Sequence, residues 1–76
     1  MDKKQLALVY LMEECNKLSS LCVKNIHNHK KTLKSDLEKN MGSLFNAMRE
    51  TVVEFDLKES NVEKALNQEV TRKNKP

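Results

Sequence analysis

Apolar residues recur at alternating steps of three and four through the first third of the chain. The central stripe and the residues that widen it are Leu8, Leu11, Cys15, Leu18 and Cys22, with Leu6, Val9, Met12 and Leu21 beside them. This spacing places the apolar side chains on one face of a helix. Asp2 suits its beginning, because a carboxylate there accepts hydrogen bonds from free backbone N–H groups. The pattern predicts one long amphipathic helix over residues 2–26.

Two shorter apolar stripes follow a polar, lysine-rich stretch at residues 27–35, which is typical of a loop. Ser35 with Glu38, and Ser60 with Glu63, match the capping-box pattern of a helix start, so we expect helices over residues 36–55 and 61–73. Their apolar residues are Leu37, Met41, Leu44, Phe45, Met48, Val52 and Phe55, then Val62, Ala65, Leu66 and Val70. Gly42 inside the second helix indicates that another backbone comes close.

Three helices with short connections predict an all-α fold. We expect a small antiparallel bundle of three main helices in one domain, residues 1–76. A chain of this size buries only roughly 60% of its unfolded surface. Each stripe is also wide enough to serve both its own core and a partner's. Oligomerisation, to a dimer or tetramer, is therefore expected to complete the bundle.

Composition narrows the classes of partner. The chain has 14 basic and 11 acidic residues, a net charge of +3, and the two signs are interspersed. With three aromatic residues and no Trp, it lacks a stacking platform for single-stranded nucleic acid. No apolar stretch is long enough to span a membrane. Composition therefore favours neither nucleic acid nor a membrane as the partner.

The cysteines and histidines suggest no covalent or metal chemistry. Cys15 and Cys22 are seven residues apart, roughly 10 Å along a helix, which is too far for a mutual disulfide. We interpret them as buried apolar fillers of a reduced, cytoplasmic protein. His27 and His29 match no zinc-binding spacing and are expected to be loop residues. The candidate contacts for phosphate or an acidic partner are Lys24, Lys30, Lys31, Lys34, Arg72 and Lys73.

Residues 11–18, which read LMEECNKL, and the following Val23-Lys24 resemble a family motif. It is the opening motif of the MazG-like, all-α nucleotide pyrophosphohydrolases, E-E-x-x-E with a lysine one or two turns later. The family's second motif, E-[L/M]-[G/A]-D, is matched in frame by residues 40–43, which read NMGS. The resemblance implies a helical enzyme fold in which four carboxylates, paired three residues apart on two facing helices, hold magnesium.

The four positions that the resemblance assigns to metal ligands are largely changed. Glu14 keeps its carboxylate, next to Glu13, but the other positions hold Lys17, Asn40 and Ser43. The charge of the site changes from −4 to zero. A lysine about 4 Å from a divalent ion costs roughly 8 kcal/mol at an effective dielectric of 20. Asn and Ser are poor substitutes for carboxylates around Mg²⁺. Lys17 could instead form an ion pair with Glu14 or Glu13.

The resulting hypothesis is a catalytically inactive MazG-like protein, without a metal cofactor, that acts by binding another protein. A phage or mobile-element factor that modulates a host or viral protein would fit that description. Two alternatives remain open. One is a residual magnesium-dependent pyrophosphohydrolase that uses Glu14 with Glu13, Glu38 or Glu50. The other is a plain helical module for protein or nucleic acid. Glu50 and Glu54, four residues apart, are expected on the solvent face.

Overall fold

A computed structural model describes residues 1–28 and 34–74 of the chain. These residues form three helices, α1 (Lys3–Asn28), α2 (Lys34–Glu54) and α3 (Glu59–Asn74), and none of them belongs to a strand. The all-α class predicted from the apolar periodicity is confirmed. The predicted helix ends differ from the observed ones by one or two residues.

The start of α1 follows the sequence closely. The Asp2 carboxylate accepts a hydrogen bond from the Gln5 backbone N–H at 2.7 Å, and the Asp2 N–H donates to Gln5 Oε1 at 3.0 Å. This reciprocal pair is a capping box, and it satisfies two backbone donors that a helix start leaves free. The predicted helix start at Asp2 is therefore confirmed.

The two predicted capping boxes at serine are wrong. Ser35 already lies within α2, which begins at Lys34, and Ser60 lies within α3. The Lys58 carbonyl accepts hydrogen bonds from the Asn61 and Val62 N–H groups at 3.0 and 3.2 Å, so the chain becomes helical two residues before the predicted start. A serine followed by glutamate three residues later also fits a helix interior, so the pattern alone misplaces the boundary.

The predicted loop at residues 27–35 falls largely on residues 29–33, which lie outside the described part of the chain. His27 and Asn28 belong to α1, and Lys34 and Ser35 belong to α2. For these four residues the loop prediction is wrong, because the helices continue beyond the ends of their apolar stripes.

The turn from α2 to α3 is a Schellman motif. The Leu57 N–H donates to the Val52 carbonyl at 2.9 Å, and the Asp56 N–H donates to the Val53 carbonyl at 3.2 Å. Asp56 has a φ of 51°, the left-handed conformation that ends many helices and that glycine adopts most easily. Two hydrogen bonds and one left-handed residue therefore define the direction in which the chain leaves α2.

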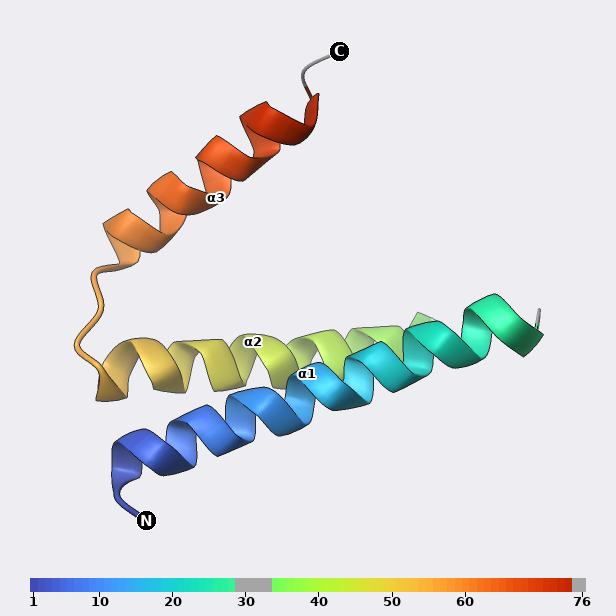
Figure 1. The fold of residues 1–76 in the computed structure, drawn as a ribbon, viewed down its shortest axis with the longest axis horizontal. Coiled ribbons are helices and arrows are strands. Elements are labelled where there is room, and N and C mark those ends of the chain that lie inside the picture. The colour runs from blue at the N-terminus through green and yellow to red at the C-terminus, as the bar shows by residue number, and fades with distance from the viewer. Residues whose placement is uncertain (29–33, 75–76) are drawn as a thin grey trace.

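α1 and α2 pack against each other along their lengths (Figure 1). Ala7 and Ala47 are the buried apolar residues of the described chain, at 4% and 0% exposure. Half-buried neighbours extend this contact at steps of three and four: Leu11, Leu18, Leu21 and Asn25 on α1, and Leu37, Asn40, Leu44, Thr51 and Glu54 on α2. The small side chains of Ala7 and Ala47 let the two helices approach closely where these residues lie.

α3 departs from this pair after the connecting turn (Figure 1). The radius of gyration is 15.0 Å, whereas a compact chain of 76 residues would have about 11 Å. Every described residue of α3 is exposed. Within the described chain Gly42 also faces open space, since a Cβ built there would meet no atom within 4 Å. The close backbone approach predicted at Gly42 is therefore absent from this single chain.

Candidate functional site

The four positions of the resemblance lie along one stretch of the α1–α2 contact. Lys17 of α1 and Asn40 of α2 line the same polar recess, about 400 Å³ in volume. Two turns towards the start of α1, the Tyr10 hydroxyl donates to the Ser43 carbonyl at 3.5 Å. Glu14 lies between Tyr10 and Lys17, one turn from each, so it faces the part of α2 between Asn40 and Ser43.

Glu14 is the buried charged residue of this contact. It is 6% exposed, whereas its neighbour Glu13 is exposed. Lys17 Nζ donates to Glu14 Oε1 at 3.2 Å, and the Lys17 side chain remains 63% exposed. One turn of helix separates the two residues, which is the spacing that allows such a pair. The pairing of Lys17 with Glu14 that the sequence allowed is therefore present.

The residues at these four positions fit a magnesium ion poorly. The Glu14 carboxylate is bound to an ammonium group, and the Asn40 amide nitrogen donates to the Asp36 carbonyl at 2.8 Å. Mg²⁺ prefers carboxylate oxygens and water, and the adjacent Lys17 charge opposes any cation. The four carboxylates that the resemblance would require are thus replaced by an ion pair within α1 and by an amide on α2.

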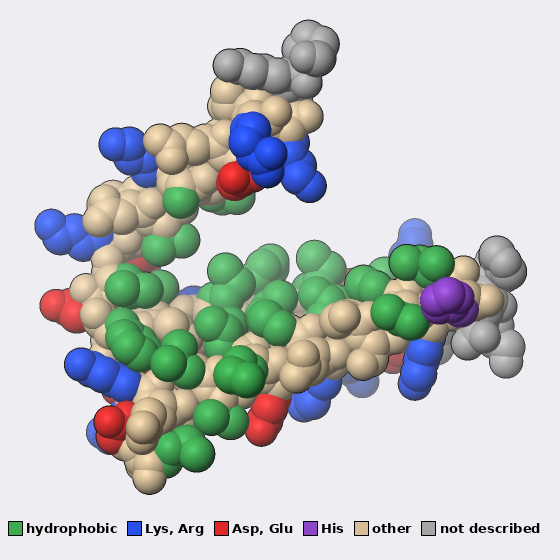
Figure 2. Space-filling view, in the orientation of Figure 1, with side chains coloured by type: hydrophobic (Ala, Val, Ile, Leu, Met, Phe, Trp, Pro, Cys, Tyr) green, Lys and Arg blue, Asp and Glu red, His purple; other side chains and the backbone are tan. Residues whose placement is uncertain are grey.

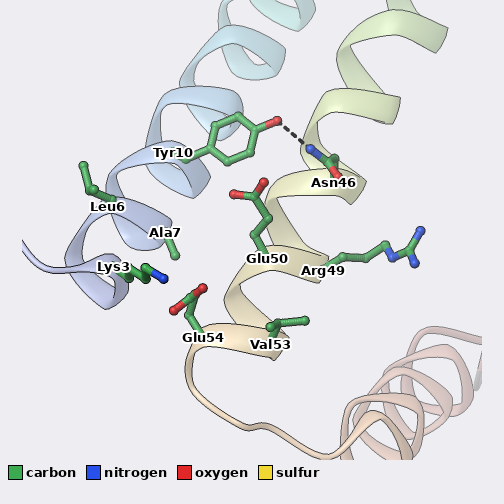
Figure 3. Close-up of a pocket in the computed structure, with 9 residues that line it drawn as sticks. All are labelled: Lys3, Leu6, Ala7, Tyr10, Asn46, Arg49, Glu50, Val53 and Glu54. Carbon is green, nitrogen blue, oxygen red and sulfur yellow. Dashed lines mark hydrogen bonds between the residues drawn. The ribbon is translucent and has the colours of Figure 1, made fainter.

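A second acidic pair lies further along the same contact (Figure 3). Glu50 and Glu54 extend from α2 toward α1 and line a recess of about 720 Å³ together with Lys3 and Tyr10. The Asn46 amide donates to the Tyr10 hydroxyl at 3.2 Å on the wall of this recess. Glu54 is half-buried. The prediction that both glutamates lie on the solvent face is therefore wrong for the half-buried Glu54, whereas Glu50 is exposed as predicted.

The glutamates of the hydrolase alternative are spread along the helices. Glu38 and Glu50 are twelve residues apart on α2, roughly 18 Å along its axis. Glu50 shares its recess with Ala7, which precedes Glu14 by seven residues, roughly 10 Å. Among residues 1–28 and 34–74, no group of three or more His, Cys, Asp or Glu side chains is arranged to hold a metal ion.

The basic candidates are distributed over all three helices. Lys24 lines the polar recess with Lys17 and Asn40, while Lys34 is exposed at the start of α2. Arg72 forms an exposed ion pair with Glu69 at 2.7 Å, and Lys73 is exposed beside it. Lys30 and Lys31, with His29, lie outside the described residues. The basic candidates that the structure describes therefore lie on different helices and form no single patch.

Both cysteines are exposed, at positions Cys15 and Cys22. The prediction that they are buried fillers is wrong for the single chain, because they lie on the side of α1 that α2 leaves open. They are free thiols, as their spacing required. No described helix is long and apolar enough to cross a membrane.

No protein-family model matches this chain, and no match is found among curated proteins or solved structures.

Proposed function

We propose that the protein acts by binding other proteins and that its MazG-like positions no longer serve catalysis. The observation that carries this proposal is the ion pair between Lys17 and the buried Glu14. Glu14 is the one carboxylate that the resemblance retains, and its charge is compensated by a side chain of the same helix. A pair of this kind stabilises the fold where a catalytic site would require an open cation position.

The surface supports binding as the mode of action. Fourteen large hydrophobic residues of the described chain are at least 41% exposed, and twelve of them lie on the three helices. Contiguous apolar surface on a small protein marks sites of protein association. Within this proposal, the antiparallel three-helix bundle is completed by oligomerisation, and the free thiols suit a reducing, cytoplasmic compartment.

Restoring the carboxylates tests the proposal. The triple variant carries Lys17→Glu, Asn40→Glu and Ser43→Asp, which recreate the residue types of the family motif. Isothermal titration with Mg²⁺ should show binding by this variant and none by the wild-type protein. The matched control carries the same three types of substitution at scattered exposed positions, Lys73→Glu, Asn61→Glu and Ser35→Asp.

The control separates a rebuilt site from a general increase in negative charge. Binding by both variants would show only non-specific attraction of the cation, and binding by neither would remove the support for a MazG-like scaffold. Stoichiometric Mg²⁺ binding by the wild-type protein, followed by magnesium-dependent pyrophosphate release from a nucleoside triphosphate, would favour the residual hydrolase.

A further inference from the structure

The α1–α2 pair has one strongly apolar side. On α1 the residues one position after the buried stripe are Leu8, Met12, Cys15, Ser19, Cys22 and Ile26, again at steps of four and three. On α2 and just after it the corresponding residues are Glu38, Met41, Phe45, Met48, Val52 and Phe55. We call the six residues of α1 and the four α2 residues from Met41 to Val52 the apolar face. Figure 2 shows hydrophobic side chains running along the pair on the side that looks toward α3.

One contact between the flanking residues indicates that the α1 and α2 parts of this face lie on the same side of the pair. The Lys4 ammonium, one turn before Leu8, lies 5.8 Å from the centre of the Phe55 ring, which comes one turn after Val52. Most of the face is open to solvent: Met12 is 63% exposed, Phe45 57% and Ile26 70%. Ser19 is the one polar residue among these ten, and the charged residues Lys4 and Glu38 lie one turn beyond the ends of the face, before Leu8 on α1 and before Met41 on α2.

The chain's own third helix does not cover this face. α3 begins beside it, where Val62 and Phe45 help to line an apolar recess of about 340 Å³, and then diverges from the pair. The Schellman turn at Asp56 defines that direction with two backbone hydrogen bonds. Further along α3, Leu66 and Val70 remain 60% and 50% exposed.

The length of α3 adds a second constraint. Its 16 residues span roughly 24 Å, whereas the 26 residues of α1 span roughly 39 Å. Even if α3 folded back from the turn along α2, it would end before Cys22 and Ile26. The far part of the apolar face therefore lies beyond the reach of α3.

The solvent-exposed area of the chain is large for a protein of its mass. The chain exposes 6756 Å², whereas a compact protein of 8.8 kDa exposes about 4,800 Å². The excess is about 2,000 Å² per chain, more than twice the roughly 800 Å² that each partner contributes to a standard interface. An interface of this size is typical of subunits that are stable only together.

We propose that a second copy of this chain covers the apolar face, with the same face of both copies in contact. In a two-fold interface the same surface of both subunits is in contact. Because the ten residues of the apolar face carry no charge, the two copies of this face can pack together without electrostatic repulsion. The same partner covers Leu66 and Val70 of α3. The inference rests on the proposed binding function and specifies its first partner, and it places Cys15 and Cys22 inside the interface.

Matched charge substitutions and sedimentation equilibrium test this interface. Met12→Glu and Met48→Glu introduce a charge on the apolar face, whereas Leu6→Glu and Val53→Glu do so at exposed apolar positions outside it (53% and 73% exposed). The wild-type chain and the two outer variants should sediment at twice the chain mass. The two face variants should dissociate at least about thirtyfold more readily, the effect of removing a central contact.

A thiol measurement keeps the test decisive if a face variant fails to fold, which circular dichroism would reveal. In the wild-type protein, Cys15 and Cys22 should react slowly with a thiol reagent at high protein concentration and faster on dilution. A wild-type monomer at micromolar concentration would overturn the proposal, whether its thiols react freely or are protected by its own α3.

Equal dissociation of all four variants would overturn the assignment of the face. Magnesium binding by the triple variant tests the proposed function separately, since that readout does not depend on the oligomeric state.

Discussion

The ion pair between Lys17 and Glu14 gives the sharpest mutational test of the site. Lys17→Met keeps the length of the side chain and removes its charge. The two charged atoms are 3.2 Å apart, where Coulomb's law gives about 5 kcal/mol at a dielectric of 20 and about 1.3 kcal/mol in water. Because the Lys17 side chain is 63% exposed, the value lies near the lower limit.

Loss of the lysine also leaves the Glu14 carboxylate, 8% exposed in its side chain, without a charged partner. We therefore expect Lys17→Met to lower the free energy of unfolding by about 1–2 kcal/mol. Urea unfolding followed by circular dichroism, at one fixed protein concentration, measures this change. Lys24→Met is the control, since Lys24 is exposed on the same helix and forms no ion pair within the described chain. Its effect should stay within about 0.5 kcal/mol.

A double-mutant cycle with Glu14→Gln isolates the pairwise part of the effect. The double variant should be less destabilised than the sum of the two single variants, with a coupling of about 1 kcal/mol. A coupling near zero, together with a fully stable Lys17→Met, would refute the reasoning that Lys17 compensates the buried carboxylate.

Three further substitutions test the fold, and each is measured by the same urea unfolding. Ala47→Leu should cost about 1–3 kcal/mol, because Ala47 is 0% exposed and the helices leave no space for a larger side chain; an unchanged stability would contradict the close contact. Asp56→Val should cost about 1–2 kcal/mol, since a β-branched residue resists a φ of 51°, whereas Asp56→Gly should be tolerated; equal effects of the two would argue against the left-handed turn. Gly42→Ala should raise stability by about 1 kcal/mol, because the added Cβ meets open space in a helix; a loss would show that another chain approaches there.

The helices were predictable from the sequence because apolar spacing and local capping are properties of neighbouring residues. The three stripes predicted three helices, and Asp2 predicted the start of the first. The sequence at the end of α2 carries no comparable pattern. A glycine at position 56 would have indicated the end of the helix, but the left-handed residue there is Asp56. The Schellman motif is therefore recognised only from its backbone hydrogen bonds.

Which part of each stripe would be buried could not be predicted in the same way. The α1 stripe contains both Leu11 and Cys15, and the structure places Leu11 in the half-buried contact with α2 and Cys15 in solvent. A rotation of the helix by a fraction of a turn would exchange them. That rotation is determined by the fit between α1 and α2 around Ala7 and Ala47, which depends on both helices together.

The candidate site was predictable in its positions and in part of its chemistry. The spacing of Glu14 and Lys17 allowed the ion pair that is observed. Asn40 and Lys17 line the same recess because α1 and α2 pack against each other. Before the structure, only the family resemblance implied that these two residues lie close together. The recess around Glu50 and Glu54 was missed, because their positions four residues apart fit a solvent face equally well.

The central proposal is that this chain binds proteins and that Lys17, by pairing with Glu14, occupies the place where the resemblance would put a cation. The most direct measurement is a pyrophosphate-release assay on the purified wild-type protein with Mg²⁺ and a mixture of nucleoside triphosphates, alongside calorimetric titration of the same components. We expect neither turnover nor a heat of Mg²⁺ binding. Magnesium-dependent turnover that disappears in Glu14→Gln would contradict the account and identify Glu14 as a working ligand.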